Sequence, residues 1–144
     1  MATQILVVED DTQIRENLKE MLMLHGFDVE TSVNGQEGIN QALLQPPDLI
    51  LCDIMMPEVD GYQVLAVVRN NRSIANVPFI FLTAKTEPAD LRRGMDQGAD
   101  DYLIKPFTLQ KLLLAIEKGV AKGQSKGAIR QLPPQSGLGS GSQA

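Results

Sequence analysis

Five polar side chains of this chain follow apolar runs and carry groups that can bind ions or react as nucleophiles. Glu9 and Asp10 follow the run ILVV, and Asp53 follows the run LILC. Thr83, with a hydroxyl group, ends the run FIFLT, and Lys105, with an ammonium group, follows DYLI. An isolated charge at the end of a buried strand is costly to desolvate, so an aspartate there is most simply a turn or capping residue. The five groups indicate chemistry only if the fold brings them together.

The three carboxylates have the composition of a divalent-metal site. Neighbouring parallel strands lie about 4.8 Å apart, so acidic groups at the ends of two such strands can reach one ion. Three negative charges beside the single ammonium of Lys105 cannot all ionise cheaply without a further cation. A few carboxylates with room for water suit Mg²⁺. The alternative is that Asp10 and Asp11 only cap a helix and that Asp53 only ends a strand.

The hydroxyl and ammonium groups favour the metal site over that alternative. Neither Thr83 nor Lys105 has an evident structural purpose at a strand end, yet together with a metal they would surround a phosphoryl group on Asp53. A carboxylate can act as a nucleophile and form an acyl phosphate. The metal and Lys105 would offset the charge of the phosphoryl oxygens, and Thr83 would donate a hydrogen bond. The set therefore predicts phosphorylation of Asp53.

Strands and helices are predicted to alternate along most of the chain. Apolar runs and period-two alternation predict five strands, over residues 5–9, 27–32, 48–53, 77–83 and 99–105. Helical spacing of apolar residues, with Pro or Gly at several ends, predicts five helices, over residues 12–26, 34–45, 62–70, 88–98 and 109–120.

Such alternation predicts an α/β fold with a doubly wound, five-stranded parallel sheet flanked by five helices. The near-continuous apolar runs ILVV, LILC and FIFL agree with strands that are buried on both faces. In an open sheet of this type, ligands bind beyond the carboxyl ends of the strands, where the strand order reverses. The five polar residues stand at such ends, so we expect them to share one edge of the sheet.

Composition limits the classes of protein to which the chain can belong. Its 144 residues, 43% hydrophobic and 22% charged, suit one globular domain. No apolar run approaches the roughly 18 residues that a membrane helix needs, and no signal sequence precedes the first strand. The net charge of −5 has the wrong sign for a surface that binds nucleic acid directly. The single cysteine, Cys52, cannot form an internal disulfide, so we expect a buried thiol in a cytoplasmic protein.

The segment 122–144 differs in composition from the rest. Of its 23 residues, 15 are Gly, Ser, Pro or Gln, and Pro133 and Pro134 interrupt any helix. We therefore predict a folded domain over residues 1–121 and a flexible tail or linker over residues 122–144.

Four motifs give the chain a family resemblance. VVEDD at 7–11, DIMMPEVDG at 53–61, TA at 83–84 and GADDYLIKPF at 98–107 occur in order within residues 4 to 121. As a set they resemble the receiver domain of response regulators in two-component systems. The resemblance implies a flavodoxin-like sheet with strand order 2-1-3-4-5, which the alternation of elements does not specify.

The resemblance also implies a role for each residue of the site. Asp53 is the phosphoacceptor, and Thr83 and Lys105 bind the phosphoryl group. Mg²⁺ is bound by Asp10, by Asp53 and by the main-chain carbonyl of Met55, with Glu9 acting through a water molecule. The residues that correspond to Met55 and Lys85 control the access of water to the phosphoaspartate in this family.

Two further features concern the switch. By resemblance, Tyr102 is the aromatic residue that turns inward when the hydroxyl of Thr83 moves to the phosphoryl group; the plain alternative is a half-buried strand tyrosine. The peptide bond between Lys105 and Pro106 resembles the cis bond of the family, and X-Pro bonds are those that readily adopt this form.

The implied partners are a sensor histidine kinase or phosphotransfer protein and a downstream target. The target would bind the face formed by the fourth helix, fifth strand and fifth helix, and a homodimer is also possible. The domain would act as a self-phosphorylating and self-dephosphorylating switch and not as a turnover enzyme.

Two other functions compete with this interpretation. A phosphohydrolase of the haloacid dehalogenase type also uses a strand-end Asp and Mg²⁺, but it requires a second Asp where this chain has Met55. A receiver-like scaffold that works without phosphorylation would not need the intact set of Asp10, Asp53, Thr83 and Lys105. With one His and one Cys, the chain has too few ligands for a zinc cage, and His25 is predicted to cap a helix.

Overall fold

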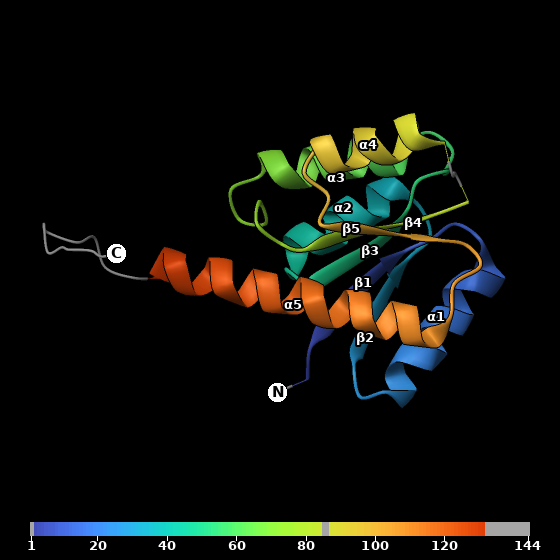
Figure 1. The fold of residues 1–144 in the computed structure, drawn as a ribbon, viewed down its shortest axis with the longest axis horizontal. Coiled ribbons are helices and arrows are strands. Elements are labelled where there is room, and N and C mark those ends of the chain that lie inside the picture. Colours follow the sequence, from blue (N-terminus) through green and yellow to red (C-terminus); the bar gives the residue numbers. More distant parts are fainter. Residues whose placement is uncertain (1, 85–86, 132–144) are drawn as a thin grey trace, which may run out of the picture.

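The fold is a five-stranded parallel sheet covered by helices on both faces (Figure 1). A computed structural model describes residues 2–84 and 87–131. The strands are β1 (Gln4–Val8), β2 (Asp28–Ser32), β3 (Leu49–Asp53), β4 (Phe79–Thr83) and β5 (Asp101–Ile104). The helices are α1 (Thr12–Leu24), α2 (Gly35–Leu44), α3 (Gly61–Asn70), α4 (Pro88–Asp96) and α5 (Leu109–Gln131). The sheet order β2-β1-β3-β4-β5 confirms the order that the family resemblance implied.

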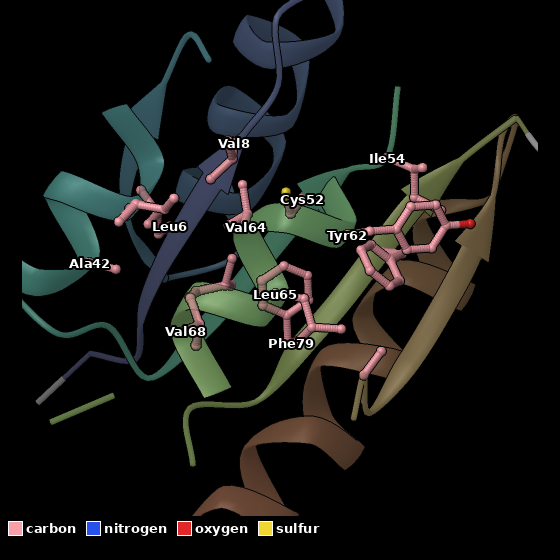
Figure 2. Close-up of a cluster of buried hydrophobic side chains, with 14 of the residues drawn as sticks. Leu6, Val8, Ala42, Cys52, Ile54, Tyr62, Val64, Leu65, Val68 and Phe79 are labelled. Carbon is pink, nitrogen blue, oxygen red and sulfur yellow. The ribbon is translucent and has the colours of Figure 1, made fainter. Parts of the chain in front are cut away.

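The strands β1, β3 and β4 are buried on both sides because each side of the sheet packs against helices. Leu6 and Val8 of β1 belong to a buried cluster with residues of α2 and α3, whereas Ile5 and Val7 belong to a second cluster with residues of α1 and α5. Figure 2 shows the first cluster, in which Val64, Leu65 and Val68 of α3 face the sheet. Figure 1 shows the same arrangement, with α1 and α5 on one side of the sheet and α2, α3 and α4 on the other. Cys52 is fully buried in the first cluster, as predicted.

Side chains cap several helix ends. Asp11 accepts a hydrogen bond from the backbone N–H of Ile14 at the start of α1, and Asp60 forms a capping box with Gln63 at the start of α3. At the end of α1, Nδ1 of His25 lies 2.9 Å from the carbonyl oxygen of Met21. The prediction that His25 caps a helix is therefore confirmed.

Helix α5 is longer than the sequence pattern indicated. We predicted its end at Val120, but it continues to Gln131 and so includes the first residues of the segment predicted as a linker. Gly119 and Gly123 do not end it. A β-carbon at Gly119 would press on the side chain of Leu49 in β3, and one at Gly123 would press on Pro78. The glycines thus let the helix pack closely on β3 and on the chain before β4. Residues 132–144 lie outside the described residues, so the flexible tail stays a prediction.

The other predicted elements are all present, and most are shorter by one or two residues at an end. Among the described residues, no helix has both the length and the apolar character needed to cross a membrane.

Candidate functional site

Three carboxylates converge at the carboxyl edge of the sheet. Glu9 and Asp10 follow β1, and Asp53 is the last residue of β3. Val8 pairs with Cys52 in the sheet, so the next residues, Glu9 and Asp53, emerge side by side. One ligand oxygen from each of the three acids lies within 4.8 Å of the other two. This cluster of Glu9, Asp10 and Asp53, here called the acidic cluster, could hold a metal ion.

Lys105 supplies a positive charge to the acidic cluster. Its Nζ lies 2.9 Å from Oε1 of Glu9 and 3.4 Å from Oδ1 of Asp53. The backbone N–H of Lys105 donates to the carbonyl oxygen of Thr83 at 2.7 Å, which joins the ends of β4 and β5. The peptide bond between Lys105 and Pro106 is cis, as the resemblance implied.

The site is short of positive charge without a further cation. Burial raises the pKa of the Glu9 carboxyl, although the hydrogen bond from Lys105 opposes that effect. Burial also raises the pKa of Asp10, and the hydrogen bond and negative charge of Glu9 add to the rise. Burial by itself lowers the pKa of Lys105, but its hydrogen bond to Glu9 and the charge of Asp53 outweigh this and raise the pKa. A divalent cation with oxygen ligands fits such a set, since it favours the ionised acids.

Thr83 stands beside Asp53 at the same edge. Asp53 pairs with Leu82 across β3 and β4, so Thr83 is one residue further along its strand. The Thr83 residue is fully buried, whereas Ala84 after it is exposed. The structure thus gathers Glu9, Asp10, Asp53, Thr83 and Lys105 at one edge of the sheet. Lys85 lies outside the described residues.

The loop between β3 and α3 contacts Asp53 through its backbone. The backbone N–H of Met55 donates to Oδ1 of Asp53 at 3.4 Å, while the Met55 side chain is 60% exposed. Gly61 fits at the start of α3 because any β-carbon there would collide with the carbonyl of Asp53. Between them, Glu58 has a φ of 69° and the N–H of Val59 donates to the carbonyl of Pro57. This pattern is a γ-turn, which is strained for a residue other than glycine.

Tyr102 lies in β5 and is half-buried. It pairs with Phe81 in the sheet and packs against the cluster that contains Tyr62 and Phe81. Both the switch residue and the plain strand tyrosine agree with this position, so the switch role stays a prediction.

Sequence reasoning missed Arg15, which supports the acidic cluster. This buried arginine of α1 donates from Nη1 to the carbonyl oxygens of Glu9 and Asp10, at 2.9 and 3.4 Å. The signal was its spacing: Arg15 stands three and seven residues before Leu18 and Leu22, on the apolar side of the helix.

Sequence reasoning also missed an ion-pair network at the opposite edge of the sheet. The side chain of Asp100 is 6% exposed and pairs with Arg69 at 3.0 Å and with Lys122 at 3.6 Å. It also accepts from the N–H of Phe79 at 2.8 Å. The network links the start of β4 and β5 to α3 and α5, far from the acidic cluster.

Comparison with known proteins places this site in a family context. A family model for the response regulator receiver domain matches residues 5–117. The probable transcriptional regulator ycf29 of Pyropia yezoensis is 39% identical over 131 residues, which are 91% of this chain and 59% of that protein. Response regulator ArlR of Staphylococcus aureus is 36% identical over 127 residues, which are 88% of this chain and 57% of that protein. The chain therefore spans less than two thirds of the length of either relative.

A solved structure agrees with the fold. The receiver domain of sensor histidine kinase PA1611 from Pseudomonas aeruginosa PAO1, which has a magnesium ion coordinated in its active site cleft, matches with a TM-score of 0.78 at 30% identity. The match covers 84% of this chain and 99% of that one.

Proposed function

The chain belongs to the response regulator receiver family, and from this premise we propose that Asp53 accepts a phosphoryl group from a histidine kinase or phosphotransfer protein. The observation that carries the proposal is the convergence of the acidic cluster and Lys105 at the carboxyl edge of the sheet. Phosphorylation of Asp53 then changes the affinity of the domain for a partner, so the protein transmits a signal.

We propose Mg²⁺ as the metal of the acidic cluster. Asp10 and Asp53 would bind it with their carboxylates, Met55 with its main-chain carbonyl and Glu9 through a water molecule. The magnesium ion in the P. aeruginosa receiver domain supports this choice. When bound, the metal offsets the negative charge of the phosphoryl oxygens and of the attacking carboxylate.

The residues of this chain perform the transfer by attack and charge stabilisation. A carboxylate oxygen of Asp53 forms a bond to phosphorus while the phosphorus–nitrogen bond of the donor phosphohistidine breaks. The electron pair of the broken bond returns to the imidazole nitrogen. Lys105, already 3.4 Å from Oδ1 of Asp53, neutralises charge on the transferred group, and the hydroxyl of Thr83 donates a hydrogen bond to it.

The signal then passes to the surface formed by α4, β5 and α5. Movement of Thr83 toward the phosphoryl group leaves space for the ring of Tyr102, which lies in β5. Tyr102 then turns inward and alters this surface, where a downstream target or a second copy of the chain binds. We place the protein in the cytoplasm, where the buried thiol of Cys52 remains reduced.

The domain is a switch and not a turnover enzyme. A phosphohydrolase of the haloacid dehalogenase type needs an acid two residues after its nucleophile, and Met55 occupies that position here. Loss of the phosphoryl group from Asp53 is a self-dephosphorylation that resets the switch.

Intact-mass measurement after incubation with acetyl phosphate and Mg²⁺ tests the proposal. The protein should gain roughly 80 Da, the mass of one phosphoryl group. Asp53→Asn or excess EDTA should abolish the gain. Persistent gain in Asp53→Asn would contradict the assignment, and steady release of phosphate from many phosphoesters would instead indicate a hydrolase. A protein that never gains mass would indicate a scaffold.

A further inference from the structure

Arg15 contacts the backbone of both acids that follow β1 and belongs to neither the metal ligands nor the phosphoryl contacts proposed above. From its contacts we infer that Arg15 is a positioning residue, which holds Glu9 and Asp10 so that their carboxylates converge on one cation. This inference rests on the proposed function of the acidic cluster and adds a residue that determines its affinity for the metal.

The guanidinium of Arg15 is buried and is directed to main-chain oxygens. Its Nη1 donates to the carbonyl of Glu9 at 2.9 Å and, more weakly, to the carbonyl of Asp10 at 3.4 Å. Nη2 donates to Oγ1 of Thr12 at 3.4 Å, and Nε lies 3.9 Å from Oε2 of Glu16. Arg15 itself is only 9% exposed. A buried charge with these partners serves to fix the backbone, because carbonyl groups that leave a strand end need donors.

Glu9 is consequently held from several directions. Its backbone N–H donates to the carbonyl of Ser32 at 3.1 Å, which extends the pairing of β1 with β2. Its carbonyl accepts from Arg15, and its carboxylate accepts from Lys105 at 2.9 Å and from the N–H of Asp11 at 3.2 Å. Arg15 is the contact in this set that also reaches the carbonyl of Asp10, so it couples the positions of the two acids.

Such restraint is needed because the acids repel one another. One carboxylate oxygen from each of Glu9, Asp10 and Asp53 lies within 4.8 Å of the other two. Without a restraint, the segment after β1 would relax by moving the carboxylates apart. The metal would then have to bring the ligands back together, at a cost to its affinity.

A positioning role and a purely electrostatic role predict opposite results. If Arg15 acted only through its charge, its removal would strengthen cation binding. If it positions the acids, removal weakens binding, and a lysine recovers only part of the affinity because an ammonium lacks the planar fork of donors. The readout is Mg²⁺ binding to the metal-free protein by calorimetry, which requires no phosphorylation.

We expect Arg15→Gln to weaken Mg²⁺ binding about tenfold, as is typical when a residue that orients metal ligands is lost. Arg15→Lys should fall between this variant and the wild type. Unchanged or tighter binding by Arg15→Gln overturns the inference. If Arg15→Gln does not fold, Arg15→Lys decides: weaker binding supports the inference and unchanged binding overturns it.

Arg69→Lys is the matched control. Like Arg15, Arg69 donates to backbone carbonyls, those of Ala75, Val77 and Gly98, but it is half-buried and lies at the other edge of the sheet. It should lose stability and keep the Mg²⁺ affinity of the wild type; an equal loss of affinity in this variant would overturn the inference, because any destabilised protein would then behave alike. If the wild type binds Mg²⁺ but gains no phosphoryl mass, the proposed function fails while the role of Arg15 stands. If the wild type binds no Mg²⁺, both fail.

Discussion

The ammonium of Lys105 lies 2.9 Å from Oε1 of Glu9 and 3.4 Å from Oδ1 of Asp53. Lys105 therefore neutralises Glu9 as well as Asp53 in the metal-free protein. A metal ion bound by the acidic cluster would compete with this ammonium for the same carboxylates.

Lys105→Ala should consequently have opposite effects on metal binding and on phosphorylation. Loss of the ammonium removes a competing positive charge, so Mg²⁺ affinity should rise roughly fivefold or more, given attractions of about 4 kcal/mol for close charges near a protein surface. Phosphoryl uptake should slow, because Lys105 stabilises the transferred group. Calorimetry and intact mass measure the two effects. Lys111→Ala, an exposed change on α5, should alter neither, and weaker Mg²⁺ binding by Lys105→Ala would refute the competition.

Asp10→Asn should stabilise the metal-free protein at pH 7. Because the folded-state pKa of Asp10 is raised above its ordinary value of 3.8, the folded protein binds more protons than the unfolded chain in the interval between the two values. The contribution of Asp10 to stability therefore falls as pH rises through that interval, and above it the ionised acid is destabilising. In urea unfolding with EDTA, Asp10→Asn should have a higher free energy of unfolding than the wild type at pH 7. The difference should shrink toward pH 4. A wild type that is the more stable of the two at pH 7 would contradict this.

A glycine at position 58 should stabilise the protein, because this residue occupies the centre of the γ-turn. Its φ of 69° is costly for a residue with a β-carbon. Glu58→Gly should therefore be about 1 kcal/mol more stable than Glu58→Ala, which loses the same charge but keeps the β-carbon. The two unfolding free energies from urea titration provide the comparison. Equal stability of the two variants would mean that the turn relaxes without cost.

The residues of the ion-pair network at the opposite edge of the sheet should differ in how much they contribute to the stability of the fold. Asp100→Ala leaves Arg69 largely buried without its acid and removes an acceptor from Phe79, so it should cost about 3 kcal/mol. Burial lowers the pKa of Arg69, and the charge and hydrogen bond of Asp100 oppose that effect. Lys122→Ala should cost less than about 1 kcal/mol, since the Lys122 side chain is 55% exposed. Thermal and urea unfolding measure the stability of the two variants. A larger loss of stability in Lys122→Ala than in Asp100→Ala would contradict this prediction.

The fold could be predicted from the sequence to a large extent because the relevant signals are local. The runs ILVV, LILC and FIFL indicate strands buried on both faces, and helical spacing between them indicates a doubly wound sheet. The strand order came from the family motifs and not from the pattern, because periodicity does not specify which strands are neighbours. The predicted end of α5 was wrong because the Gly-, Ser-, Pro- and Gln-rich composition after residue 121 indicated a linker, whereas the helix continues to Gln131 and packs with Gly123 against Pro78.

Sequence by itself determined which residues stand at strand ends, and hence the candidate set of Glu9, Asp10, Asp53, Thr83 and Lys105. Only the tertiary structure decided how they are held. The pairing of Lys105 with Glu9 joins residues 96 positions apart. The pairing of Arg69 with Asp100 joins α3 to the residue that precedes β5. Such contacts depend on distances between packed elements, which no local pattern encodes. The contact of Arg15 with the carbonyl of Glu9 spans only six residues, but it exists because α1 packs against the sheet at that point.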